Sequence, residues 1–195
     1  MEPKTPLIQD GVLVEYPGYR LTLNGDNTVN LDLNSFSAHC HTILKKDGGP
    51  SGRAEVAELL RKVLQDAEAV KTYLGPNTSE REVLYEDPEL GFCIVAHRYT
   101  GPKTSDAHDH AHSWAIYGQA TGETQMNDYT LIEKAHGAQL GKIRMTRTYS
   151  LTPGVAHVYN EGDIHSPKRV APTSLIRIEG SNMANVTRDR FDLVQ

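Results

Sequence analysis

The sequence predicts an all-β core preceded by an N-terminal extension that contains a helix. After residue 80 the chain consists of short apolar stretches separated by Gly, Pro, Asn and Asp, with no helical periodicity between them. Many short strands at such intervals are typical of a β-barrel or sandwich. Before residue 80, one segment has the spacing of an amphipathic helix. We expect a single domain over residues 1–195, divided into an extension (1–80), a barrel core (81–182) and a C-terminal tail (183–195).

The extension is expected to begin with short strands and to continue into one helix. The stretches GVLVEYPGYRLTL and NTVNLDL have alternating or β-branched residues, and Pro17-Gly18 and Asn24-Gly25-Asp26 punctuate them as turns. The helix is expected over about residues 52–74, and Gly75-Pro76 ends it. Its buried face has these members at three-to-four spacing: Val56, Leu60, Val63, Leu64, Ala67 and Val70.

Seven stretches of the core are expected to form strands. They read EVLY, GFCIVAHRY, SWAIYGQA, TQMNDYTLIE, GKIRMTRTYSL, AHVYN and TSLIRIEG. Each is short and lies between turn-forming residues, as strands of a barrel do.

The composition limits the classes of partner. The chain is 38% hydrophobic and 23% charged, as an ordinary globular protein is, and its net charge of -5 gives no support for nucleic-acid or membrane binding. No run reaches 18 apolar residues, the first residues lack the apolar core of a signal peptide, and two cysteines make no disulfide framework. We therefore expect a cytoplasmic monomer or homodimer whose partners are small molecules.

The segment HDHAHSW, residues 108–114, holds the strongest functional signal. Residues two apart in a strand point to the same face, roughly 7 Å apart along the chain. His108 and His110 can therefore converge on one metal ion while Asp109 points away. The pair alone also fits two surface histidines in a loop. His112 continues the alternation and is expected beside the ligands or exposed, and Trp114 is expected to pack outside the barrel lumen.

The surrounding residues resemble the first motif of the cupin superfamily, which reads His-x-His, three or four residues, Glu, six residues, Gly. His108, His110 and Gly122 are in place, but Ala115 stands at the glutamate position. The resemblance implies a cupin β-barrel, or jelly roll. The glutamate is usually a fourth metal ligand in that family, so its absence implies a site completed by a histidine of the second motif.

Two histidines are candidates for the third ligand. YNEGDIHS resembles the second motif of thiol dioxygenases of the cysteine dioxygenase type, which favours His165, whereas TPGVAHVYN resembles the general cupin pattern and makes His157 the alternative. That family carries a histidine and a tyrosine where this chain has Ile176 and Ile178, and the cysteine that some members crosslink falls at Ala115. The resemblance thus implies a three-histidine site without a crosslinked cofactor.

The ligand set indicates the chemistry. Imidazoles suit Fe, Zn, Cu or Ni, and a divalent site without a carboxylate is more positive by one charge, which favours an anionic, chelating substrate. With the resemblance, this predicts an oxidoreductase: a non-haem Fe(II) dioxygenase that transfers O₂ to a small anionic substrate. Two alternatives stay open, a cupin lyase or isomerase that uses Zn, Ni or Mn as a Lewis acid, and a non-enzymatic metal- or ligand-binding cupin.

Three residues are candidates for catalytic work beside the metal. If Ala115 faces the lumen, so does Tyr117, and on another strand the same alternation pairs His97 with Tyr99. Each of the three also fits an ordinary core residue, since a buried tyrosine usually needs one hydrogen-bond partner.

Other polar residues are candidates for supporting roles. A carboxylated substrate needs a cation, and arginine offers a bidentate fork, which makes Arg81, Arg147 and Arg177 the substrate-binding candidates. Metal-bound histidines need a partner for their second nitrogen, and the carboxylates beside them in sequence are Asp106, Asp109 and Asp163. Simple turn chemistry is the favoured interpretation of Asp106 and Asp163. A second His-x-His match, HCH at 39–41, lacks a partner motif and is expected to be structural.

Overall fold

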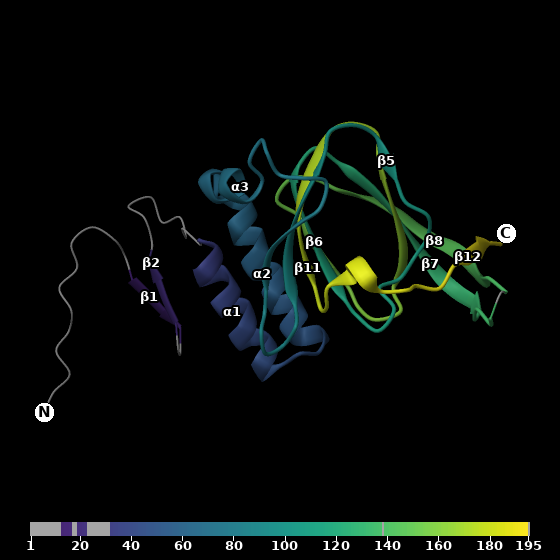
Figure 1. The fold of residues 1–195 in the computed structure, drawn as a ribbon, viewed down its shortest axis with the longest axis horizontal. Coiled ribbons are helices and arrows are strands. Elements are labelled where there is room, and N and C mark those ends of the chain that lie inside the picture. Colours follow the sequence, from purple (N-terminus) through teal and green to yellow (C-terminus); the bar gives the residue numbers. More distant parts are fainter. Residues whose placement is uncertain (1–12, 17–18, 23–31, 138, 195) are drawn as a thin grey trace, which may run out of the picture.

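The computed structural model describes residues 13–16, 19–22, 32–137 and 139–194 (Figure 1). Near the N-terminus, β1 (Leu13–Tyr16) and β2 (Tyr19–Thr22) pair as antiparallel neighbours. The two expected turns, at Pro17-Gly18 and Asn24-Gly25-Asp26, and most of the expected strand NTVNLDL lie outside the described residues. No helix in the described ranges is long and apolar enough to cross a bilayer.

Two five-stranded sheets form the core. In order across the sheet, the first contains β3 (Glu82–Glu86), β4 (Cys93–Tyr99), β11 (Thr173–Glu179), β6 (Ala115–Thr121) and β9 (Ala156–Tyr159). The second contains β12 (Phe191–Leu193), β8 (Gly141–Leu151), β7 (Thr124–Glu133), β10 (Ile164–Arg169) and β5 (Lys103–Thr104). All neighbours are antiparallel except β12, which runs parallel to β8.

The strand order is that of a jelly roll. The eight strands from β4 to β11 divide into the sheets β4-β11-β6-β9 and β5-β10-β7-β8, which is the double Greek-key arrangement of cupin-type barrels. The expected all-β barrel with a helical extension is thus confirmed. The seven stretches expected as strands all form strands, and β5, β10 and β12 are additional.

Three helices cover the outer face of the first sheet (Figure 1). They are α1 (Leu33–Lys46), α2 (Pro50–Gln65) and α3 (Ala67–Tyr73). The single helix expected over 52–74 is wrong, because the chain breaks at Asp66, whose carboxylate accepts hydrogen bonds from the backbone N–H groups of Glu68 and Ala69 and so caps a new helix. The break also changes the buried face: Ala67, expected on it, is exposed. The helix α1 was not expected. It contains the HCH segment, in which His41 bonds Asp87 at 2.8 Å and ties α1 to the turn before β4.

Side-chain alternation on β6 separates the two cores. Trp114 and Ile116 belong to the apolar cluster between the helices and the sheet, whereas Ala115 and Tyr117 belong to the cluster inside the barrel. The expectation that Trp114 packs outside the lumen is therefore confirmed. The lumen side of β6 is the face that meets the histidines.

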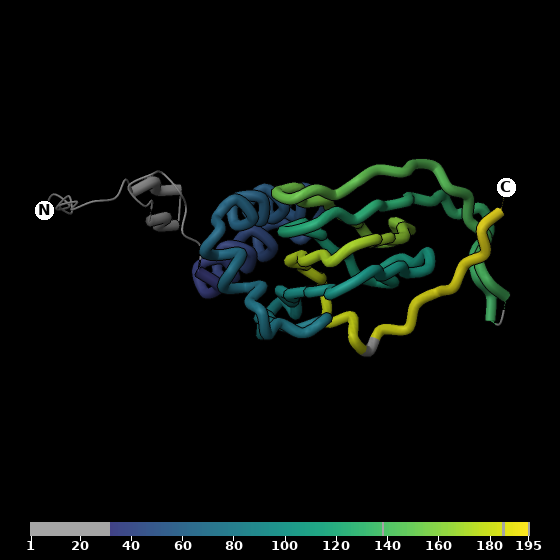
Figure 2. Tube along the Cα trace, turned by 90° about the horizontal axis from the view of Figure 1, so that it is seen from above, coloured from purple at the N-terminus to yellow at the C-terminus, as the bar shows by residue number. Residues whose placement is uncertain are grey.

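The segment expected as a C-terminal tail contributes to the barrel. It passes through a short 3-10 helix (Met183–Asn185) and ends in β12, where Phe191 pairs with Gly141 of β8. In two views the helices lie on one side of the barrel and this last segment reaches the opposite side (Figures 1 and 2).

Candidate metal centre and its cavity

A single backbone bridge sets two of the three candidate histidines side by side. The N–H of His108 donates to the carbonyl of His165 at 3.0 Å, and the N–H of His165 donates back to His108 at 2.9 Å. His165 lies on β10, so a residue of the second sheet is held directly opposite the loop that follows β5. Residues joined in this way across an antiparallel pair have neighbouring side chains.

The third histidine follows two residues later and precedes a sharp turn. The sequence predicts a strand from His108 to His110. The structure has no regular strand there, because the segment pairs with β10 at one point only. Directly after His110, Ala111 adopts a positive φ of 52°, and Asp109 accepts a hydrogen bond from its N–H at 3.0 Å. The turn carries His112 to the surface, where it is exposed.

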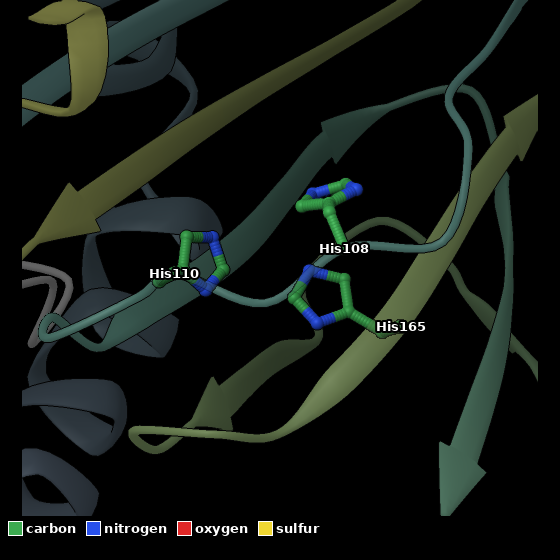
Figure 3. Close-up of side chains that lie close together, drawn as sticks. All are labelled: His108, His110 and His165. Atoms are coloured by element: carbon green, nitrogen blue, oxygen red, sulfur yellow. The ribbon is translucent and has the colours of Figure 1, made fainter. Parts of the chain in front are cut away.

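The three side chains point toward one another (Figure 3). One nitrogen from each of His108, His110 and His165 lies within 4.8 Å of the other two. Ligand nitrogens on one ion at about 2.0–2.1 Å lie at most about 4.2 Å apart, so small movements of the rings would close the cluster on a metal. No other His, Cys, Asp or Glu joins this group in the described part of the chain.

The alternative third ligand lies elsewhere. His157 is on β9, where it pairs with Tyr117 across the strands and packs its ring 4.6 Å from Tyr159 and 5.2 Å from Tyr149. It lines a smaller cavity together with Asp128 and other residues. The structure therefore brings His165, and not His157, to the histidine pair.

Backbone carbonyls fix the orientation of two of the imidazoles. Nδ1 of His108 lies 2.7 Å from the carbonyl oxygen of Asp106, and Nδ1 of His165 lies 3.0 Å from that of Asp163. A carbonyl only accepts, so both Nδ1 atoms carry the proton and both Nε2 atoms keep a lone pair for a metal. Asp106 and Asp163, two of the three candidate partners, thus meet these histidines through the main chain and not through their carboxylates. The Asp163 carboxylate instead caps the turn at Asn160.

Burial keeps the cluster uncharged. Loss of solvent lowers the pKa of His110 to about 2 and that of His108 to about 4, and holds the pKa of His165 well below its usual range. Nearby arginine charges act in the same direction. Neutral imidazoles are the form that binds metal, so this donor set fits a divalent transition-metal ion.

Tyr117 closes the inner side of the cluster. Its hydroxyl lies 3.2 Å from Nε2 of His110 and 3.3 Å from Nε2 of His165. Burial raises the pKa of this phenol, which therefore keeps its proton and can donate to either nitrogen. The guanidinium of Arg177 lies 4.1 Å from the centre of the Tyr117 ring. Ala115, at the glutamate position, is fully buried on the same face.

A cavity of about 870 Å³ opens beside His108. Two of the expected substrate-binding residues, Arg81 and Arg177, line it. Both bond the buried carboxylate of Glu179, at 2.8 and 3.1 Å. Arg147 does not line it, because the β7–β8 pairing sets Arg147 against Asp128, to which it donates at 2.6 and 3.0 Å.

His97 and Tyr99 also line the cavity. Nδ1 of His97 lies 3.0 Å from the carbonyl oxygen of Glu80 and 3.2 Å from the Tyr99 hydroxyl. Burial, followed by the charge of Arg177, holds the pKa of His97 well below its usual range. The alternation along β4 thus brings both residues to the cavity, and their catalytic role stays a prediction.

Sequence reasoning missed further cations at the cavity. Arg169 is 2% exposed and lines its wall. The signal that could have found it is the alternation of β10, which places residues 165, 167 and 169 on one face. Lys103, Arg188 and Arg190 also line the cavity, the last two from the segment before β12.

No family model matches the chain, and no curated protein matches it. The solved structures that resemble its fold include an uncharacterised protein with a double-stranded β-helix domain from Klebsiella pneumoniae (14% identity, 63% of this chain and 88% of that chain, TM-score 0.41). They also include a cupin superfamily protein from Desulfitobacterium hafniense (11%, 50% and 72%, TM-score 0.37) and KdgF from Halomonas sp. (17%, 51% and 75%, TM-score 0.37). The assignment of the fold depends on the strand order described above, and nothing about activity follows from these similarities.

Proposed function

We propose that His108, His110 and His165 hold Fe(II) and that the protein is a dioxygenase that incorporates O₂ into a small anionic substrate. One observation carries the proposal: three neutral imidazoles converge beside a cavity that His108 lines and whose walls carry arginines. The family resemblance of the two histidine motifs supports the choice of iron.

The charge of the donor set favours an anionic substrate. Three neutral imidazoles leave the full charge of a divalent ion uncompensated, whereas the common two-histidine, one-carboxylate set removes one unit of it. Iron held in this way would supply the one-electron chemistry that O₂ requires and open positions for the reactants. The cavity beside His108 adds the positive field of Arg81 and Arg177.

The chain's own residues would orient the substrate and control protons. Tyr117 is buried and protonated next to Nε2 of His110 and His165, so it can donate a hydrogen bond to a reactant at the cluster. His97, neutral and buried in the cavity wall, can accept a hydrogen bond from a reactant in the cavity. Tyr99 stacks on His97 with ring centres 5.8 Å apart and limits the rotation of that imidazole.

Metal analysis of protein made without a histidine tag tests the proposal. We expect near-stoichiometric iron in the wild type, its loss in His165→Ala, and its retention in the matched control His157→Ala, whose ring lies in the other cavity. An oxygen electrode then screens thiols, diketones and hydroxy acids for O₂ consumption by the iron-loaded protein.

Three results would contradict the proposal. Iron lost only in His157→Ala would show that His157, and not His165, is the third ligand. Stoichiometric zinc, nickel or manganese with no O₂ consumption would favour a Lewis-acid lyase or isomerase. No metal after anaerobic reconstitution with Fe(II) would leave a ligand-binding protein.

A further inference from the structure

Four buried polar atoms beside the cavity have no hydrogen-bond partner among the described residues. They are Nε and Nη2 of Arg169, Nε of Arg177 and Nε2 of His97, and all three residues line the cavity. A buried polar atom without a partner costs free energy. Their concentration at one cavity therefore indicates a ligand that supplies the missing partners.

Arg169 is the most unusual of the three residues. Its side chain forms no ion pair within the described ranges, and its guanidinium lies 4.4 Å from the centre of the Tyr99 ring. The Nε–H and the Nη2–H lie on one edge of the guanidinium and point in the same direction. That edge matches the two oxygens of a carboxylate in a bidentate pair.

The charges around the cavity favour an anion. Arg81 and Arg177 share the single carboxylate of Glu179, and Arg169 has none. Over the whole lining the excess is one positive charge, because the Glu179 carboxylate bonded to Arg81 and Arg177 and four acidic side chains offset six basic ones. The acidic residues are Glu80, Asp106, Asp189 and Asp192, and the basic ones are Arg81, Lys103, Arg169, Arg177, Arg188 and Arg190. A substrate with an ammonium group is disfavoured there, because like charges repel in a partly buried site.

His97 selects for a different group. Its Nδ1–H donates to the Glu80 carbonyl, which leaves Nε2 as a hydrogen-bond acceptor. An acceptor beside an excess of positive charge suits a neutral donor, and a hydroxyl group is the donor that meets this requirement.

We propose that the cavity binds a hydroxy carboxylate, with the carboxylate on the free edge of Arg169, a further hydrogen bond from Nε of Arg177, and a hydroxyl donated to Nε2 of His97. The proposal deepens the proposed function, on which it depends only for the group that would react at the histidine cluster. It distinguishes this substrate from an amino acid of the same size.

Binding to metal-free protein tests this inference separately from activity. Isothermal titration calorimetry compares glycerate with serine, which carries an ammonium in place of the C2 hydroxyl, with propionate, which lacks both hydroxyls, and with inorganic phosphate. We expect glycerate to bind at least tenfold more tightly than serine. We expect Arg169→Met to weaken glycerate binding at least tenfold, whereas the matched control Arg147→Met, an arginine likewise stacked on a tyrosine but outside the cavity, leaves it within twofold.

Two further measurements keep the test decisive. Arg169→Met replaces an unpaired buried charge by an apolar chain, so we expect its melting temperature to equal or exceed that of the wild type; Arg169→Lys serves if that variant does not fold. His97→Phe should reduce the preference for glycerate over propionate at least fivefold without weakening propionate.

The inference would be overturned by equal affinity for serine and glycerate, by equal effects of the Arg169 and Arg147 variants, by tighter binding of phosphate, or by no glycerate binding at tens of millimolar. Specific glycerate binding without iron loading or O₂ consumption would instead refute the dioxygenase and leave the carboxylate site in place.

Discussion

Among single residues, Tyr117 contacts two histidines of the cluster through one hydroxyl. One phenol proton faces the Nε2 atoms of both His110 and His165, at 3.2 and 3.3 Å. The ring is held between Arg177 and Tyr159, whose ring centre is 5.0 Å away. In metal-free protein this hydroxyl therefore satisfies one buried imidazole nitrogen, and a bound metal would take over that nitrogen.

Tyr117→Phe separates these two states. The variant keeps the ring and removes the hydroxyl, so metal-free protein should lose about 1 kcal/mol of stability. Zinc-loaded protein should lose less, because the ion satisfies the nitrogens, and the increase in melting temperature on adding Zn²⁺ should grow. Thermal melts with and without Zn²⁺ measure the difference.

Tyr129→Phe is the control for this prediction. Its hydroxyl bonds Ser166 at 2.8 Å, away from the cluster, so the variant should lose equal stability in both states. Equal losses for Tyr117→Phe as well would show that its hydroxyl does not serve the metal-binding nitrogens.

The residues at the site differ in how far the sequence indicates them. The His-x-His spacing and the turn before His165 identify three histidines that do lie together. Each of the two motifs is a local pattern, so the sequence shows it directly. Arg169 was missed because IHSPKR reads as a polar segment around Pro167 and not as a strand. The sequence does not show that Arg147 lies outside this cavity, because alternation gives the face of a strand but not its partner strand, and here that partner presents Asp128.

At the scale of elements, the helix layer lies directly on the strand that carries Tyr117. A Cβ added at Gly118 would lie 2.6 Å from Cδ2 of Leu60 and 3.0 Å from Cδ1 of Leu64. The helix α2 can approach β6 this closely only because Gly118 has no side chain. The position of β6, and of the Tyr117 ring on its other face, therefore depends on this contact.

Gly118→Ala should force α2 away from the sheet. Overpacking of this kind costs about 1–3 kcal/mol, and urea denaturation should show the loss. Gly101→Ala is the control, since a Cβ there meets nothing within 4 Å, and it should change stability by less than about 0.5 kcal/mol. The double variant Gly118→Ala, Leu60→Ala should show a positive coupling between the two sites; strictly additive losses would contradict the contact.

The sequence indicates the strands more completely than the helices. Each expected strand is bounded by turn residues, and that punctuation survives in the fold. The helix α1 was missed because LNSFSAHCHTILKK mixes polar residues with an incomplete apolar face, and its burial depends on packing against other elements. The break at Asp66 depends on a side-chain cap that periodicity does not reveal.

Over the whole molecule, one arginine connects the helix layer to both ligand-bearing segments. Arg53 of α2 donates to the Glu161 carboxylate at 2.5 and 2.6 Å and to Asn160 at 3.0 Å, in the turn before His165. Its guanidinium also lies 5.3 Å from the ring centre of Trp114, which follows His110. The extension is thus part of the scaffold that holds the histidines.

The same burial that prepares the cluster for a metal makes metal-free protein sensitive to acid. The pKa of His108 is lowered to about 4 and that of His110 to about 2, and the pKa values of His97 and His165 are also lowered by burial. The ordinary pKa of histidine is about 6.5, so near and below that pH the unfolded chain binds more protons than the folded chain. The stability from the neutral histidines is therefore fully present well above pH 6.5 and decreases as the pH falls.

Between pH 7.5 and pH 5, His108 and His110 should each remove about 2 kcal/mol from the free energy of unfolding of metal-free protein. Carboxylates with lowered pKa values, such as those of Asp87 and Glu161, lose their contribution only at lower pH, so this window reports the histidines. Urea denaturation at pH 7.5, 6.5, 5.5 and 5.0 measures the decline, and His108→Gln should show a shallower one. A midpoint that does not change from pH 7.5 to 5.0 would contradict a neutral buried cluster, because no proton uptake would then accompany unfolding.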